Sequence, residues 1–248
     1  MIVETNIQFK INSEQIYNSL LLSMNRIFLT GIFMLASFVA LAQTSVGIRG
    51  GYATSTYSYR ATPSNRVASV DGIGAPTFAL VFEHFNSKNA GIEINLQFLR
   101  IGFSQIEDVD IDPILTNETQ FDYLKVPILS SFFLGRSGRF QIKAGPHLGY
   151  MLQAKDIKRE FSDTTPLEIP TYGGSDDKPR KIMYGLTAGA GISKLFGKST
   201  LTGEVRFAYD FTNPEGQERI FDMSSTNLEF TLAYLFRIKD SKIEKLKD

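Results

Sequence analysis

The sequence predicts an all-β fold, an eight-stranded antiparallel up-and-down transmembrane β-barrel. Three observations support this prediction. Apolar and polar residues alternate along eight segments after Thr44, with the period of two that marks a strand. Most segments reach the ~9–11 residues of a tilted membrane-crossing strand, whereas strands of globular proteins average about 5–6 residues. The connections alternate between long and short, as expected when loops and turns gather on opposite sides of a membrane.

The first four expected strands are 46–59, 77–85, 91–104 and 121–134. Their polar faces carry Arg49, Glu83, Glu93 and Lys125 in turn. In the third strand, the apolar face that begins at Ile92 would next present Arg100. A bulge could reset the register there. We expect instead that Arg100 stands at the outer rim of the membrane.

The last four expected strands are 140–155, 182–196, 201–211 and 227–236. Alternation is clearest in the first of these, where Phe140 and Ile142 oppose Gln141 and Lys143. The strand 182–196 carries glycines on its polar face, which allow close packing inside a barrel. The last two strands follow the same alternation, with charged residues opposite Phe, Tyr and Leu. Their polar faces hold Glu204, Arg206, Asp210 and Glu229.

The expected connections separate cleanly by length. The short ones are 86–89, 135–138 and 197–199, and the long ones are 60–76, 105–120, 156–181 and 212–224. With an even number of strands, both termini of the barrel then lie on the periplasmic side. Pro127 and Pro146 fall inside strands, where each removes a ladder donor although a closed barrel has no edge strand. Bulges could absorb them.

The N-terminal region resembles an export signal. Met24, Asn25 and Arg26 precede a short apolar run that ends in Ala-Leu-Ala, so residues 24–42 are expected to be a signal peptide. Cleavage between Ala42 and Gln43 would release the barrel domain, 43–236. Residues 1–23 are interpreted as a misassigned upstream extension, and residues 237–248 as a charged periplasmic tail.

Composition excludes several classes of protein. The chain has 26 basic and 26 acidic residues, so no global field attracts nucleic acid. It has no cysteine, which excludes disulfides, thiolate metal sites and cysteine nucleophiles. The 20 Phe, 10 Tyr and 20 Gly suit a β protein with tight turns.

The candidate site is the interior of the barrel. An eight-stranded barrel is just wide enough for side chains to fill it, and buried charges persist only when paired. We therefore expect the charges of the polar face to form an internal salt-bridge network. This network is either structural filling, which we favour, or an ion or proton path, and a wide pore is not expected. Its nine members are Arg49, Glu83, Glu93, Lys125, Lys143, Glu204, Arg206, Asp210 and Glu229.

Two proline-containing strands resemble a known family. Tyr123-Leu124-Lys125-Val126-Pro127-Ile128-Leu129 is similar to a conserved strand of the PorT-like outer-membrane β-barrel family of Bacteroidota, and Gly145-Pro146-His147-Leu148-Gly149-Tyr150 to its following strand. Gly47-Ile48-Arg49-Gly50-Gly51-Tyr52 resembles its opening strand, although the usual Asn is missing. The resemblance implies a fold and an outer-membrane location. It implies an accessory role in secretion for some members and no reaction.

The sequence contains no recognisable catalytic or metal-binding motif. His84 is expected on the apolar face near a short turn and His147 in the lumen, and no nucleophile elbow surrounds a serine. The acidic run Glu107 to Asp112 has alternate Asp residues, but Pro113 stands where a calcium loop needs Gly. It is expected to be a solvated loop, with divalent-ion bridging to lipopolysaccharide as the alternative.

We therefore expect an outer-membrane protein with a structural or accessory envelope role and no enzymatic activity, cofactor or metal. Its expected partners are outer-membrane lipid, lipopolysaccharide and an unidentified envelope or secretion protein. Two alternatives remain at this stage. One is an enzyme of lipid or lipopolysaccharide, and the other is a soluble lipocalin-like carrier whose apolar face points inward.

Overall fold

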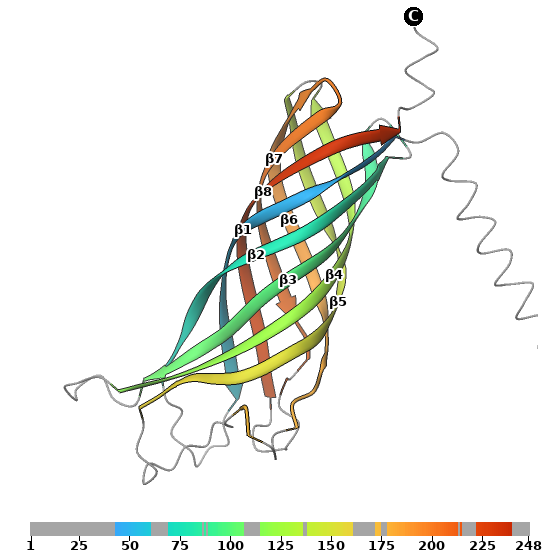
Figure 1. Cartoon of the computed structure of the whole chain (residues 1–248). Helices are drawn as coiled ribbons and strands as arrows, with labels where there is room; N and C mark the ends of the chain where they lie inside the picture. The colour runs from blue at the N-terminus through green and yellow to red at the C-terminus, as the bar shows by residue number, and fades with distance from the viewer. Residues whose placement is uncertain are drawn as a thin grey trace, which may run out of the picture. The chain divides into compact units, whose positions relative to one another are not determined.

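The computed structural model describes residues 43–60, 69–85, 87, 89–106, 115–135, 138–160, 172–174, 178–212, 214 and 222–239. They form one closed ring of antiparallel strands, each paired with its neighbours in sequence, and β8 paired with β1 (Figure 1). The predicted eight-stranded up-and-down barrel is confirmed. The strands are β1 (Gln43–Arg60), β2 (Ser69–Phe85), β3 (Ala90–Ile106), β4 (Thr116–Gly135), β5 (Gly138–Arg159), β6 (Ile182–Phe196), β7 (Ser199–Asp210) and β8 (Asp222–Lys239).

Several strands run further than the sequence indicates. β2 starts at Ser69 instead of residue 77, and β4 starts at Thr116 instead of residue 121. β8 continues to Lys239, so residues 237–239 belong to the barrel and not to the expected tail. The bounds of β6 match the prediction, and β7 ends one residue early, at Asp210.

Some expectations lie outside the described residues. They are the upstream extension 1–23, the signal peptide 24–42 with its cleavage site before Gln43, the acidic run 107–112 and the tail from residue 240. These stay predictions. Within the described residues, no helix has the length and apolar character needed to cross a bilayer.

Side chains alternate between the two sides of the barrel wall along most of each strand. In β3, for example, Glu93, Asn95 and Gln97 are buried inside while Ile92 and Leu96 are exposed outside. The same alternation around the ring makes a continuous apolar band on the outer surface. Its members include Ile48, Tyr52, Phe78, Leu80, Phe82, Ile128, Phe132, Ile142, Leu148, Tyr150, Leu186, Ile192, Val205, Phe207, Tyr209, Phe230, Leu232, Tyr234 and Phe236. A soluble carrier with its apolar face inward is therefore excluded.

The polarity of the wall inverts towards the long-loop end. Beyond Phe98, the outward positions of β3 carry Arg100 and Ser104, while the inward Leu99, Ile101 and Phe103 are fully buried. The register of β3 with β4 is unbroken through Arg100, as expected for a residue at the rim, whereas the register of β2 with β3 shifts between Gly72 and Phe78. The barrel thus has an apolar exterior in one part and an apolar interior in the other. Such a switch is typical of strands that leave a membrane and enter water.

Both prolines are accommodated without a bulge. Pro127 lies opposite His147 in β5, and Pro146 lies opposite Leu186 in β6. The register is the same on both sides of each proline, so neither proline is absorbed by a bulge. A proline in an antiparallel strand loses the hydrogen bond to one neighbour only, and the long ladders on either side hold the register.

Two of the short turns need glycine. Gly135 and Gly197 adopt φ values of 112° and 60°, a region that side chains with a Cβ rarely occupy. Each glycine follows directly on an outward aromatic or aliphatic residue at the end of a strand. A positive φ at Gly135 and at Gly197 lets the chain turn back within a short connection at this end of the barrel.

Candidate functional site

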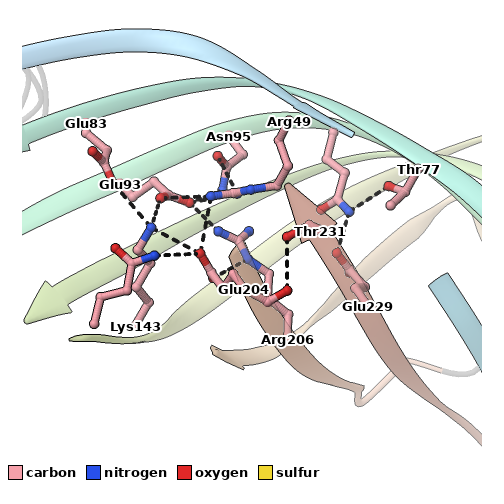
Figure 2. A network of polar contacts seen from close by, with 12 residues as sticks. Arg49, Thr77, Glu83, Glu93, Asn95, Lys143, Glu204, Arg206, Glu229 and Thr231 are labelled. Atoms are coloured by element: carbon pink, nitrogen blue, oxygen red, sulfur yellow. Dashed lines mark hydrogen bonds and ion pairs between the residues drawn. The ribbon is translucent and has the colours of Figure 1, made fainter. Parts of the chain in front are cut away.

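All nine predicted lumen residues are buried inside the barrel. The register separates them into two groups along the barrel. Six lie nearer the short-turn end and are referred to below as the ionic cluster (Figure 2). They are Arg49, Lys143, Arg206, Glu83, Glu93 and Glu204. The remaining three, Lys125, Asp210 and Glu229, lie above the ionic cluster towards the long-loop end.

Glu93 is the centre of the ionic cluster. Its carboxylate accepts hydrogen bonds from Arg49, at 2.9 and 3.1 Å, and from Lys143 and Arg206. Asn95 donates to the same carboxylate at 2.8 Å. Glu93 has no solvent-exposed surface, so three cations and one amide replace the water that a free carboxylate would bind.

Glu204 is the second acceptor. It receives Arg206 Nε at 2.5 Å, Lys143 Nζ at 3.2 Å and Arg49 Nη2 at 3.4 Å. Among the residues that the structure describes, Glu83 forms one ion pair, with Lys143 at 3.2 Å. Three cations thus face three carboxylates from β1, β2, β3, β5 and β7. The ion pairs of the cluster therefore connect opposite walls of the barrel across the lumen.

The second group consists of two pairs. Lys125 lies 3.9 Å from Glu229, whose other oxygen accepts Gln97 Nε2 at 2.8 Å. Asp210 accepts a hydrogen bond from Asn227 at 2.9 Å and one from Ser225, and it contacts His147 Nε2 at 2.7 Å. Alternation along the strands identified the charged members and placed Asn227 on the polar face, but the sequence analysis did not single out the neutral partners Gln97 and Ser225. Their inward parity is a signal that could have found them.

His147 joins a carboxylate to a hydroxyl. Its Nδ1 lies 2.9 Å from Thr187 Oγ1 while its Nε2 contacts Asp210. The order carboxylate, imidazole, hydroxyl is the one that activates a nucleophile in hydrolases. Here all three side chains are buried, with Thr187 only 3% exposed, so no substrate reaches the hydroxyl. The chain of contacts therefore serves to satisfy polar groups inside the barrel.

His84 lies apart from this group. It is half-buried on the outer face at the short-turn end, stacked on Phe82 and in contact with Thr44 Oγ1 at 3.1 Å. The described residues contain no group of three or more His, Asp or Glu placed to hold a metal ion.

Inward glycines make room for the large charged side chains. A Cβ on Gly189 would lie 2.7 Å from Glu204 Oε1, and a Cβ on Gly185 would lie 2.8 Å from His147 Nε2. Real Cβ atoms do not approach that closely. The glycines on the inner face of β6 therefore accommodate the side chains of β5 and β7, as the sequence predicted for close packing.

The long-loop end of the lumen is filled by apolar side chains, which the sequence analysis did not predict. This inner apolar cluster comprises Ala53, Tyr57, Leu99, Ile101, Phe103, Phe121, Tyr123, Met151, Tyr172 and Met183. Nine of these residues come from strands. Tyr172 comes from the connection between β5 and β6, and its ring packs edge-on against Phe121 at a centroid distance of 4.9 Å. The lumen is thus charged in one half and apolar in the other.

Comparison with known families agrees with this architecture. Residues 41–216 match the outer membrane protein beta-barrel domain. The chain belongs to that family. The membership supports the outer-membrane location predicted from the sequence. It does not by itself distinguish a PorT-like subgroup.

Solved structures with similar folds share little sequence with the chain. Ail of Yersinia pestis is 14% identical, with 78% of this chain and 99% of that chain covered and a TM-score of 0.40. OprG of Pseudomonas aeruginosa is 13% identical, with coverage of 82% and 99% and a TM-score of 0.46. The outer membrane protein AlkL, solved in lipid bilayers, is 10% identical, with coverage of 81% and 93% and a TM-score of 0.47. No curated protein sequence matches the chain.

Proposed function

We propose that this outer-membrane barrel is a sealed anchor with a structural or accessory role in the envelope. The observation that carries the proposal is the filling of the lumen. The ionic cluster crosses the barrel near one end, and the inner apolar cluster closes it towards the other. An ion entering from either end meets a layer of side chains that contact one another directly. We favour structural filling over an ion or proton path because seven of the ten residues of the inner apolar cluster have no side-chain group that could relay a proton.

The proposed orientation follows from the loops. The short turns lie on the periplasmic side, together with both ends of the barrel domain, and the long connections lie outside. Around the outer band the partners are outer-membrane lipid and lipopolysaccharide. A further partner from the envelope or a secretion system is proposed without an identity, in keeping with the PorT-like motifs at Pro127 and Pro146.

Ion conductance tests the proposal. The folded protein, with folding checked by heat-dependent migration on gels, is inserted into planar lipid bilayers in concentrated potassium chloride. We expect no stable current steps. Regular unitary steps from correctly folded protein would show a continuous aqueous path and overturn the proposal of a sealed barrel.

We also propose that the chain is not an enzyme. The burial of His147 supports this proposal, since its ring lies inside the barrel, out of reach of a substrate in solution. Purified protein is incubated with phospholipid and with lipid A, beside the variants His84→Ala and His147→Gln. The proposal expects no turnover by any of the three. Turnover by the wild type that either variant abolishes would establish a lipid-modifying activity.

A further inference from the structure

A groove of about 680 Å³ crosses the outer wall of the barrel, nearer the short-turn end. Five of the residues that line it occupy outward positions, which strand pairing places in one row across five strands. They are Gly50 of β1, Leu232 of β8, Gly203 of β7, Ile192 of β6 and Phe140 of β5. The volume lies within the range of about 300–1,000 Å³ that is typical of ligand sites. The outer apolar band therefore contains a hollow large enough to hold a ligand.

The groove exists because two positions of this row carry no side chain. A Cβ on Gly50 and a Cβ on Gly203 would lie 3.7 and 3.6 Å from their nearest neighbours, which are ordinary contact distances. A Cβ on the inward Gly51, in contrast, would collide with the carbonyl oxygen of Phe230. Packing of the wall thus requires glycine at the inward position but leaves room for a side chain at the two outward ones. The groove is therefore not imposed by the packing of the strands.

The lining of the groove is apolar. The next row of outward positions, towards the long-loop end, adds Phe230, Val205 and Ala190. Glu204 and Thr231 also line the groove, but they are buried inward positions, so the strand backbone forms part of the floor. Within a bilayer, contact between apolar groups brings no hydrophobic gain, so such a groove holds a ligand by close packing. The ligand that this position and this lining favour is an acyl chain.

Exposed basic residues lie beside the groove on its short-turn side. Lys194 is the outward residue that follows Ile192 in β6, and its Nζ lies 5.3 Å from the centre of the Phe196 ring. Lys198 lies in the turn between β6 and β7. β6 contains no acidic residue, and both carboxylates of β7 are buried inside the barrel. The outer face of these two strands therefore favours an anion at this end of the groove.

We propose that the groove binds an acyl chain of an anionic glycerophospholipid whose phosphate contacts Lys194. Consecutive outward positions on a strand lie about 6–7 Å apart, a span that the glycerol bridges between phosphate and acyl chains. The inference rests on the outer-membrane anchor proposed above, whose orientation puts Lys194 at the periplasmic leaflet, and it adds the lipid and its site. The groove is continuous with the lipid-facing band, and the charges beside it are complementary to a phosphate. A second copy of the chain fits less well, because docking this face on itself would bring the cations of both copies together.

Native mass spectrometry of the folded protein, released from detergent, tests the proposal. The probe is palmitoyl-oleoyl-phosphatidylglycerol at increasing concentration, with the matching phosphatidylcholine and lipid A as competitors. We expect one molecule of phosphatidylglycerol to stay bound to the wild type and neither competitor to displace it at equal concentration. No retained lipid, or a preference for lipid A, would overturn the proposal. A dimer in place of the lipid complex would identify a second copy as the occupant and would also overturn it.

Two variants, each with a matched control, locate the bound lipid. Gly203→Leu fills the groove and should abolish the retained complex, whereas Ala188→Leu enlarges an exposed position of β6 that does not line the groove and should not change binding. Lys194→Gln should weaken binding about fivefold, the factor for one basic side chain near an anionic membrane surface. Lys158→Gln removes the same charge at the long-loop end and should have no effect. A complex that survives Gly203→Leu, or an unchanged affinity of Lys194→Gln, would contradict the proposal.

A measurement in vesicles covers the case in which Gly203→Leu fails to fold. The chain has no tryptophan, so Phe140→Trp in the groove and Ile94→Trp elsewhere in the outer band each introduce a single fluorescent reporter. The vesicles mix phosphatidylglycerol with brominated acyl chains, which quench an indole in contact, and unlabelled phosphatidylcholine. Relative to fully brominated vesicles, quenching at Phe140→Trp should exceed quenching at Ile94→Trp. Equal quenching in folded protein would overturn the lipid site, while the proposed anchor, tested by conductance, would stand.

Discussion

At the scale of single residues, the carboxylates of the ionic cluster differ in how many cations they bind. Glu93 accepts three cationic side chains, whereas Glu83, within the described part of the chain, is paired with Lys143 alone. Removing one partner of a buried ion pair typically costs about 3–5 kcal/mol, because the other charge stays buried without compensation. The cost should therefore rise with the number of cations that lose their acceptor.

We predict that Glu93→Gln lowers the free energy of unfolding by about 3–5 kcal/mol, and Glu83→Gln by clearly less. Urea titration of the protein folded in lipid vesicles measures both. The two variants have the same change in charge and volume, so each controls for the other. A smaller loss for Glu93→Gln than for Glu83→Gln would mean that Glu93 is not the centre of the cluster.

Inward glycine gives a second residue-scale prediction. A Cβ on Gly185 would collide with the backbone carbonyl oxygen of Tyr209 and meet the ring of His147 at 2.7 to 2.8 Å, whereas a Cβ on the outward-facing Gly50 would meet Phe78 at an ordinary 3.7 Å. Gly185→Ala should destabilise the barrel by about 1–3 kcal/mol, the usual cost of overpacking. Gly50→Ala should change stability by less than about 0.5 kcal/mol, as surface substitutions usually do. Urea titration in lipid vesicles measures the free energy of unfolding of both variants. Equal losses for Gly185→Ala and Gly50→Ala would argue against tight packing on the inner face of β6.

At the scale of elements, each strand of β1 to β5 crosses two environments. On the outer face, Leu80 of β2 lies within the apolar band, and Thr56 of β1 lies beyond Tyr52, where the outer face is polar. A Lys facing lipid near the bilayer midplane costs about 2–4 kcal/mol, and one near the interface costs about 0–1 kcal/mol. Leu80→Lys should therefore be strongly destabilising, and Thr56→Lys close to neutral.

The comparison is made by unfolding both variants from vesicles of the same lipid.

On the inner face of the barrel wall, a charge should be unfavourable at the height where the outer face tolerates it. Ile101→Lys places a charge in the inner apolar cluster and should prevent stable folding, although Ile101 lies at the level where the outer face is polar. A tolerated Ile101→Lys would contradict the inversion of the barrel wall.

How far the sequence predicts these elements depends on that inversion. β6 keeps one polarity over its length, and its bounds 182–196 could be read from alternation alone. β4 begins earlier than expected because its outward residues become polar at Gln120 and Asp122 while the inward Phe121 is apolar. The strand continues there, but the rule that connects polarity with face is reversed.

For the candidate site, the sequence predicts which side chains point inward but not which of them meet. Parity along the strands was enough to place all nine charged residues inside. Which charges meet depends on the stagger between strands, so contacts such as Arg206 with Glu93 needed the register. Tyr172 lies in a long connection whose sequence carries no period that points to the lumen.

At the scale of the whole molecule, the central claim is that the apolar outer band of the barrel faces lipid and ends at a definite height. The chain has no cysteine, so single cysteines can be introduced one at a time and spin-labelled. The labels are placed at outward positions of β1, which lie at successive heights along the barrel wall. These positions are Val46, Ile48, Gly50, Tyr52, Thr54, Thr56 and Ser58.

Collision of these labels with oxygen, which concentrates in lipid, and with a water-soluble nickel complex is the decisive measurement. We predict that labels at positions 46 to 52 collide mainly with oxygen, that labels at positions 54 to 58 collide mainly with nickel, and that the change falls between Tyr52 and Thr54. Uniform access of the nickel complex to all seven positions in folded, vesicle-bound protein would contradict the claim that this band lies in the membrane.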